Sequence, residues 1–360
     1  YNINYTHNKT NGISEAANPT GNNTLFDKDG FKTDGVNANF GVKLNQHFSI
    51  NPFLRYFEGN YMIDESAFSD GLADNHSLLK NFSGGLNSKY EFATGKINLN
   101  YSYQTSTNNT VSSYDGFAYE SVGAGRISLI DLFYNQKLGN KVDLLIGLDN
   151  RVMNLSSGEN KPRTNIFAAY SSLFLHDLSI FNLELGGRYN KHEQYGENYT
   201  YSITPSINVI NELKLFGTVS TAFKIPTLNM LFGQFGANLN LKPEKSQNYE
   251  AGFNLSFADD KFSLRGAAYK RDLKDAIIYD FAAGYINQES QKVKGFEIEP
   301  SLKVWKLTLN GYYAFTEGNE YNSVNNKVED FLFRRPKHTF GITTGFQATD
   351  NLFINANFRY

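Results

Sequence analysis

The sequence predicts an all-β transmembrane antiparallel β-barrel on three observations. Polar and apolar residues alternate with a period of two, the alternating segments are long enough to cross a bilayer, and short and long connections follow each other in turn. Residues 96–104 show the alternation most clearly, with Ile97, Leu99, Tyr101 and Tyr103 at every second position and Asn, Ser or Gln between them. A strand places two such sets on opposite faces, whereas a helix would scatter them around its circumference.

About 17 segments of this kind recur along the chain, each about 9–12 residues long, which is the length of a tilted strand that crosses a membrane. Strands of soluble proteins average about 5–6 residues. Other clear examples are residues 36–44, 48–56, 181–189, 213–219, 249–257, 296–304 and 352–360. Pro52 and Pro205 fall within such segments, and because proline removes a ladder hydrogen bond we expect local bulges there.

The connections between these segments are of two kinds. The tight ones are rich in turn residues and include residues 45–47, 94–95, 139–140, 211–212, 259–260 and 349–351. The long ones are residues 9–34, 62–76, 107–121, 153–163, 224–247 and 317–335. Short turns at one end and long loops at the other are typical of outer-membrane barrels, with the turns periplasmic and the loops extracellular.

Composition argues against several functional classes. The 360 residues include no Cys, which excludes a disulfide framework and thiolate metal sites, and the formal charge of −2 offers no basic field for nucleic acid. The six His never lie three or four positions apart, and no nucleophile elbow or phosphate-binding loop motif occurs, so we expect no enzyme and no covalent cofactor. Aromatic residues make up 15% of the chain at a mean hydropathy of −0.45, which indicates rings scattered among polar residues.

Motifs in the second half of the chain identify the type of barrel. They are STAFKIPTL at residues 220–228, LFG at 231–233, NLNLKPEKS at 238–246, YEAG at 249–252, NQESQKVKGFE at 287–297 and RRPKH at 334–338. In this order they resemble the barrel of TonB-dependent outer-membrane receptors. The 223–245 run, together with FDKDGF at residues 26–31, looks most like the cobalamin (vitamin B12) receptors of that family.

The resemblance implies a barrel that spans residues 1–360, with about 17 of an expected 22 or so strands present. It also implies that the plug domain before residue 1 and the last strands after residue 360 are absent. The implied function is uptake of a cobalamin-like ligand across the outer membrane of a Gram-negative bacterium, with energy from TonB acting through the plug. The expected partners are therefore this ligand, TonB and outer-membrane lipids. Whether a surface lipoprotein is a further partner stays open.

Three other functions stay open on the sequence alone. The first is a receptor of the same family for a siderophore or for haem, because ligand choice depends on loops that one sequence does not decode. The second is a passive porin, because barrels of about 16–18 strands leave a water channel. The third is a soluble β-rich adhesin. Inward polar residues such as Glu184, Arg188, Glu250, Glu297 and Glu299 are interpreted as a hydrated barrel interior.

Acidic residues in two neighbouring long loops are candidate metal ligands. They are Asp27 and Asp29 in the first loop, which also holds Asp34, and Asp64, Asp70 and Asp74 in the second, which also holds Glu65. Calcium takes 6–8 oxygen ligands, which carboxylates supply. The resemblance implies calcium-ordered loops, with Asp27 and Asp29 matching best. The alternative is that these are solvated loop acids.

Aromatic residues of the long loops are candidate contacts for the ligand. They are Phe232, Phe235, Phe26, Phe31, Phe68, Tyr114 and Phe117. Rings of this kind bind apolar ligand faces by burying surface. Phe232 and Phe235 are the strongest candidates because they lie in the LFGQFG segment. The alternative is that these rings pack within the loops or belong to the aromatic girdle.

Overall fold

The computed structural model describes residues 1–21, 26–71, 75–114, 116–259, 261–280, 282–322, 327–330, 332 and 335–360. Its elements are β1 (Asn2–Thr10), β2 (Phe31–Asn39), β3 (Val42–Lys43), β4 (Phe48–Met62), β5 (His76–Phe92), β6 (Gly95–Tyr114), β7 (Phe117–Lys137), β8 (Val142–Ser157), β9 (Arg163–Leu178), β10 (Phe181–His192), β11 (Gly196–Ile210), β12 (Leu213–Lys224), α1 (Leu228–Phe232), β13 (Glu244–Phe257), β14 (Phe262–Asp280), β15 (Gly284–Val304), β16 (Leu307–Gly318), β17 (Glu320–Asn322), β18 (Lys327–Glu329), β19 (His338–Thr349) and β20 (Leu352–Arg359). No helix among these residues is long and apolar enough to cross a membrane.

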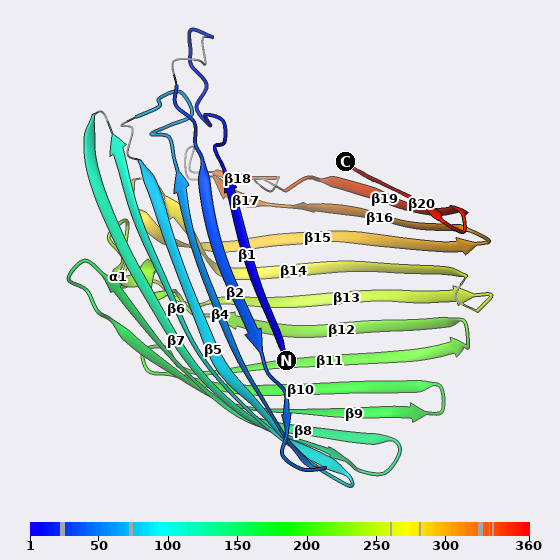
Figure 1. Ribbon diagram of the computed structural model, residues 1–360. Coiled ribbons are helices and arrows are strands. Elements are labelled where there is room, and N and C mark those ends of the chain that lie inside the picture. The colour runs from blue at the N-terminus through cyan, green and yellow to red at the C-terminus, as the bar shows by residue number, and fades with distance from the viewer. Residues whose placement is uncertain are drawn as a thin grey trace.

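Eighteen of these strands form one sheet in which chain neighbours pair antiparallel (Figure 1). β2 and β3 pair with β4 in one unbroken register and so make up a single crossing strand, which leaves 17 crossings in the described sheet. The two other strands, β17 and β18, form a separate hairpin between β16 and β19. Within the described residues, β1 pairs with β2 alone and β20 with β19 alone. The prediction of an all-β antiparallel barrel with about 17 strands is confirmed.

Connections at the two ends of the strands differ in length, as predicted. At one end, here called the short-turn end, each connection has two to four residues. At the other, the long-loop end, the chain makes its longest connections, residues 11–30, 63–75, 225–243 and 319–337. Two predicted loops were wrong in part. Residues 107–121 and 153–163 are mostly strand, because β6, β7 and β8 continue their hydrogen-bonded ladders to the end of each hairpin.

The expected bulges at Pro52 and Pro205 were also wrong. Pro52 pairs with Leu86, and Pro205 with Leu183, in unshifted register. Proline removes a donor without adding a residue, so it interrupts a ladder without displacing it. Opposite Pro52 the outcome is the short break between β2 and β3, where the Phe40 N–H still bonds to the Pro52 carbonyl at 3.0 Å.

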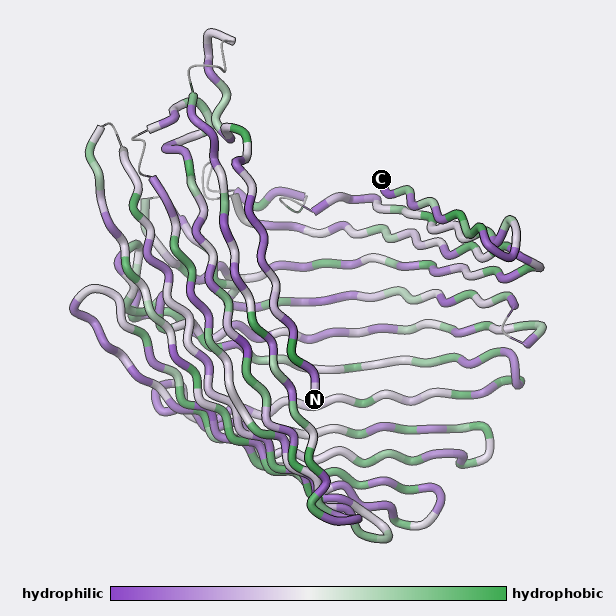
Figure 2. Tube along the Cα trace, in the orientation of Figure 1, coloured by the Kyte–Doolittle hydropathy of each residue, from purple (hydrophilic) through white to green (hydrophobic). Residues whose placement is uncertain are grey.

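Register assigns each side chain to one face of the wall, because directly paired residues in antiparallel strands share a face. On β15, the set Val304, Leu302, Pro300, Ile298 and Phe296 lies on the outer face. These five positions cover about 26 Å of strand and, at a tilt of about 40°, roughly 20 Å of membrane, close to the apolar band of such barrels. Figure 2 shows the resulting alternation of hydrophobic and hydrophilic residues along the strands.

Candidate functional site

Two connections at the long-loop end, residues 11–30 and 63–75, pack against each other. The Ala17 N–H donates to the Ala67 carbonyl at 2.8 Å, so backbone joins backbone directly. The second connection is held from its other side by Asn75, which is 2% exposed and whose amide donates to Ser113 on β6 at 2.9 Å. The pair of loops is therefore anchored to the wall of the sheet.

This packing brings three of the predicted aspartates together. One oxygen from each of Asp27, Asp64 and Asp70 lies within 4.8 Å of the others. The Asp27 N–H donates to both carboxylate oxygens of Asp70, at 3.1 and 3.2 Å. One Asp64 oxygen accepts from the Ala16 N–H at 2.5 Å, and the other is buried without a hydrogen-bond partner in the described part of the chain. These three residues are called the Asp27 cluster below.

Crowding of negative charge marks the electrostatics of this cluster. Burial, followed by the nearby Asp29 and Asp70 carboxylates, raises the pKa of Asp64 to about 6. Burial and the same type of repulsion, from Asp70 and Asp29, also raise the pKa of Asp27. A divalent cation would relieve this repulsion, and carboxylate oxygens are ligands that calcium prefers. The three carboxylates would supply part of the set of ligands that calcium needs.

The other two predicted aspartates are placed differently. Asp29 lies beside the cluster, half-buried, and its carboxylate accepts from the Glu15 N–H at 2.7 Å. Its carbonyl lies so close to Gly12 that a Cβ at that glycine would come within 1.9 Å, and Gly12 has a φ of +63°. Asp74 lies outside the described residues.

A second feature of the long-loop end is the segment of residues 225–243, here called the mouth segment, which contains α1. Thr227 caps α1 by accepting from the Met230 N–H at 3.2 Å, and Pro226, Leu231 and Leu241 are buried. Because β12 and β13 are adjacent, the segment leaves and re-enters neighbouring strands. Its middle nevertheless contacts distant parts of the sheet on both sides.

Hydrogen bonds join the mouth segment to two separate parts of the wall. Towards β7–β9, the Asn160 amide donates to the Phe232 carbonyl at 3.2 Å, and the Ser121 hydroxyl donates to the Gln234 side chain at 3.3 Å. Towards the β14–β15 hairpin, the Tyr285 N–H donates to the Gly236 carbonyl at 2.8 Å. The segment therefore connects strands that are far apart in the sheet.

Close approach of backbone explains two glycines at this contact. Gly236 has a φ of +64° and Gly284 a φ of +75°. A Cβ on Gly284 would lie 2.5 Å from the Gly236 carbonyl oxygen. Only glycine adopts such a backbone readily and leaves room for a second chain, so these residues let the mouth segment dock on the hairpin.

A cavity of about 450 Å³ lies between the mouth segment and the inner face of the wall. Its lining includes Leu228 from the segment and Ile127, Met153 and Leu155 from β7 and β8, with Gln104 and Thr164 adding polar groups. A mostly apolar cavity of this size with a few polar groups is suited to a small organic ligand.

The predicted aromatic residues are distributed around the long-loop end. Phe235 in the mouth segment is 57% exposed, and Phe68 and Phe117 on the rim are 67% and 77% exposed. Phe232 is half-buried at the end of α1, and Phe26 is half-buried next to Asp27. Phe31 packs on Tyr61, with ring centroids 5.9 Å apart. The Tyr114 side chain lies outside the described residues.

Sequence reasoning missed the residues that hold the mouth segment in place. Asn160 and Ser121 are ordinary polar residues of predicted loops, and nothing in their spacing indicates a partner more than 70 positions away. The polar groups on the inner wall were predicted as hydrated, but Asp149 is 8% exposed and pairs with Arg188 at 2.6 Å. Only the pairing of β8, β9 and β10 brings these groups together.

Comparison with known proteins gives one family match over nearly the whole chain. The model described as "TonB dependent receptor-like, beta-barrel" matches residues 2–360. A vitamin B12 transporter, BtuB of Photobacterium profundum, is 24% identical over 256 residues, which are 70% of this chain and 41% of that protein. The chain thus spans less than half the length of this relative.

Solved structures share the fold at lower sequence identity. The ferric enterobactin receptor PfeA of Pseudomonas aeruginosa (a G324V mutant) matches with a TM-score of 0.81 at 16% identity, over all of this chain and 63% of that one. The ferric-catecholate import receptor Fiu from K12 E. coli matches with a TM-score of 0.78 at 12% identity, over 99% of this chain and 66% of that one. At these identities the likeness concerns the fold.

Proposed function

Since this chain belongs to the family of TonB-dependent receptor β-barrels, we propose that it forms the wall of an outer-membrane receptor that captures a cobalamin-like corrinoid. The ligand binds at the long-loop end, which faces outward from the cell. It then passes to the periplasm with energy delivered through TonB, acting on a plug supplied by another part of the receptor. Barrels of this family are outer-membrane proteins of Gram-negative bacteria, and the family is one of transporters and receptors.

The observation that carries the proposal is the mouth segment, which bears the exposed ring of Phe235 and lines a largely apolar cavity with Leu228. A corrinoid has a broad, partly apolar macrocycle, and exposed rings of a loop bind such a surface by burying it. Similarity to a vitamin B12 transporter over 256 residues supports this ligand class.

A ferric siderophore is the second candidate ligand. Several solved receptors with this fold bear the names of siderophore or ferric-enterobactin receptors. Ligand choice depends on the loops rather than on the wall, so this likeness in fold favours the second candidate only weakly. Haem is a further candidate ligand for a receptor of this family. A passive porin is less favoured, because the matched family is one of receptors.

We further propose that the Asp27 cluster binds calcium and so orders the two loops that carry it. The support is the approach of three carboxylates within 4.8 Å and the buried Asp64 oxygen that lacks a hydrogen-bond partner in the described chain. A bound cation would join residues 11–30 to residues 63–75 and hold Phe26 and Phe68 at the rim. A surface lipoprotein that covers this rim stays a prediction.

A titration tests the proposed ligand. The complete receptor, with its plug and remaining strands, is titrated in detergent with cyanocobalamin, ferric enterobactin and haemin, and heat is measured. We expect saturable binding of cyanocobalamin alone, and a loss of roughly tenfold in affinity for Phe235→Ala, the effect of removing one well-buried contact ring. Trp305→Ala is the matched control, because Trp305 is an 83% exposed ring at the short-turn end.

Two results would overturn the proposal. Saturable binding of ferric enterobactin or haemin without cyanocobalamin would assign the receptor to the second ligand class. Equal loss of affinity in both variants would show that Phe235 has no special part in binding. Uptake of radiolabelled cobalamin by cells with and without TonB then tests the energy source, and uptake that is the same in both would exclude TonB.

A further inference from the structure

The outer face of β13–β15 carries a concentration of lysines at the long-loop end. Lys270 on β14 lies directly opposite Lys294 on β15, and Lys245 on β13 lies directly opposite Lys274 on β14. Like charges placed directly opposite each other in antiparallel strands are destabilising. Two such pairs side by side therefore concentrate positive charge on this part of the outer face.

Carboxylates of the described chain compensate for only part of this charge. Lys270 pairs with Asp272 at 3.1 Å, and Lys294 pairs with Glu317 at 2.9 Å. Glu317 is shared, since Lys337 also reaches it, at 3.3 Å. With Lys292, which lies opposite Asp272, the described part of the patch has six lysines, of which Lys270, Lys294 and Lys337 share two carboxylates. The six lysines, 245, 270, 274, 292, 294 and 337, are called the lysine patch.

A groove of about 850 Å³ lies directly beside the lysine patch on the same outer face. Its floor is a row of small residues in register, Gly217, Ala251 and Ala268. Larger side chains, including Tyr249 and Phe296, form its walls, and Lys270 and Lys294 border it. The groove is therefore apolar along its floor and cationic at one edge.

The position of the groove defines what it faces. Phe296 and the four outward residues that follow it on β15 belong to the apolar band. Lys294, two positions before Phe296, is the first charged outward position towards the long-loop end. The groove thus lies within the hydrocarbon of the membrane, and the lysines lie at the level of the headgroups. Its walls face acyl chains, so a water-soluble ligand does not fit there.

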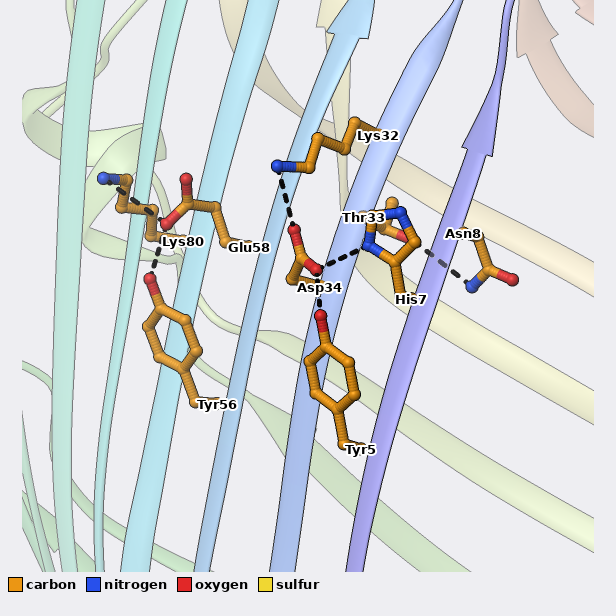
Figure 3. A network of polar contacts seen from close by, with 9 residues as sticks. All are labelled: Tyr5, His7, Asn8, Lys32, Thr33, Asp34, Tyr56, Glu58 and Lys80. Atoms are coloured by element: carbon orange, nitrogen blue, oxygen red, sulfur yellow. Dashed lines mark hydrogen bonds and ion pairs between the residues drawn. The ribbon is translucent and has the colours of Figure 1, made fainter.

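A second charged group on the outer face provides a contrast. On β1–β5 at the same level, Asp34 accepts from Tyr5 at 2.7 Å, bonds His7 at 2.7 Å and pairs with Lys32 at 3.5 Å (Figure 3). Beside it Glu58 accepts from Tyr56 at 2.6 Å and pairs with Lys80 at 3.6 Å. That group also holds one directly opposed lysine pair, Lys9 and Lys32. The lysine patch has two such pairs side by side, which makes it the denser of the two.

We propose that the lysine patch and its groove bind an acylated lipid with an anionic phosphate headgroup from the outer leaflet. One acyl chain lies over Gly217, Ala251 and Ala268, between the aromatic walls. The phosphate lies against Lys270 and Lys294, where basic residues near a membrane surface attract anionic lipid. The site is separate from the mouth segment, so its occupant is a resident of the membrane and not the transported ligand.

Native mass spectrometry of the complete receptor tests this proposal. The receptor is stripped of lipid and titrated with diphosphorylated lipid A, with lipid A lacking both phosphates, and with inorganic phosphate as a competitor. Lys270→Gln/Lys294→Gln removes the charge at the groove, and Ala268→Phe fills its floor. The matched control is Lys32→Gln/Lys80→Gln, which removes two outward lysines at the same level of the wall.

We expect the lysine double variant to lose affinity for the phosphorylated lipid by roughly 10–30-fold, the effect of two basic residues near a headgroup. Ala268→Phe should weaken binding of both lipids, and the control should bind normally. Cyanocobalamin titrations of the same variants should be unchanged, which separates this site from the proposed transport function. Displacement of the lipid by millimolar phosphate would reduce the site to an anion site. Equal binding by all variants would overturn the proposal.

Discussion

The side-chain amide of Asn160 donates to the backbone carbonyl of Phe232 at 3.2 Å and so ties the end of α1 to the β8–β9 turn. Such a bond contributes about 0.5–1.5 kcal/mol. We expect Asn160→Ala to release this end of the mouth segment, with amide hydrogen exchange at residues 228–236 faster by roughly 2–10-fold. Mass-spectrometric exchange on the receptor measures this. Asn60→Ala, an exposed amide on β4, is the control, and unchanged exchange in Asn160→Ala would show that other contacts hold α1.

Arg188 on the inner wall is expected to stabilise the barrel because of the acids around it. Asp131 and Asp149 lie directly opposite each other, and Arg188 reaches Asp149 at 2.6 Å. Removing one partner of a buried pair leaves an uncompensated charge, which costs about 3–5 kcal/mol for full burial. Since Arg188 is 33% exposed, we expect about 2–3 kcal/mol from Arg188→Ala.

Urea unfolding of the receptor in lipid vesicles measures this difference. The matched control is Arg265→Ala, because Arg265 is another inner-wall arginine paired with carboxylates, Glu250 and Glu299, but all three side chains are 39–47% exposed. Exposed pairs contribute about 0–1 kcal/mol. Equal destabilisation by the two variants would contradict the role given to burial.

The wall could be predicted from sequence for a simple physical reason. Each crossing strand has one face in lipid and one in water. Apolar and polar residues therefore alternate along the strand, as in residues 96–104. The break opposite Pro52 was harder to predict, because proline can either shift a register or interrupt a ladder. Only the observed pairing with Leu86 decides between these outcomes.

The contacts of the long-loop end could be predicted only in part. Asp27, Asp64 and Asp70 were singled out because acidic residues recur in neighbouring loops, and the fold does bring those three together. The link from Asn160 to Phe232 depends instead on how residues 225–243 cross to β8, which no local pattern encodes. The lysine patch likewise emerges only when register places residues from three strands side by side.

Because its two faces differ in surroundings, the wall predicts unequal effects for neighbouring substitutions on β10. Leu185 is the central residue of five apolar or small outward positions, and Glu184 faces inward by the same register. An arginine facing lipid near the midplane costs about 2–4 kcal/mol, whereas one facing the interior is hydrated. We expect Leu185→Arg to lower the stability of the folded barrel by that amount and Glu184→Arg to lower it far less. Equal effects in urea unfolding would contradict the assignment of faces.

Calcium binding by the Asp27 cluster should depend on pH through Asp64. Its pKa is raised to about 6, so the fold favours the protonated carboxyl. Without metal, the stability from this group is present at low pH and is lost as the pH rises through about 6. A cation needs the charged form, so calcium affinity should fall roughly tenfold for each pH unit below 6, if one proton competes with one ion.

Calorimetric titration of calcium at pH 7.5, 6 and 5 checks this expectation on the complete receptor. Asp64→Asn resembles the protonated state and should bind calcium weakly at every pH, because the amide offers one neutral oxygen in place of a charged carboxylate. Asp350→Asn, in the turn between β19 and β20 at the opposite end of the wall, is the matched control and should retain the pH dependence. The same affinity at all three pH values in the unmodified receptor would show that calcium does not compete with the Asp64 proton, and no binding heat at pH 7.5 would exclude the site altogether.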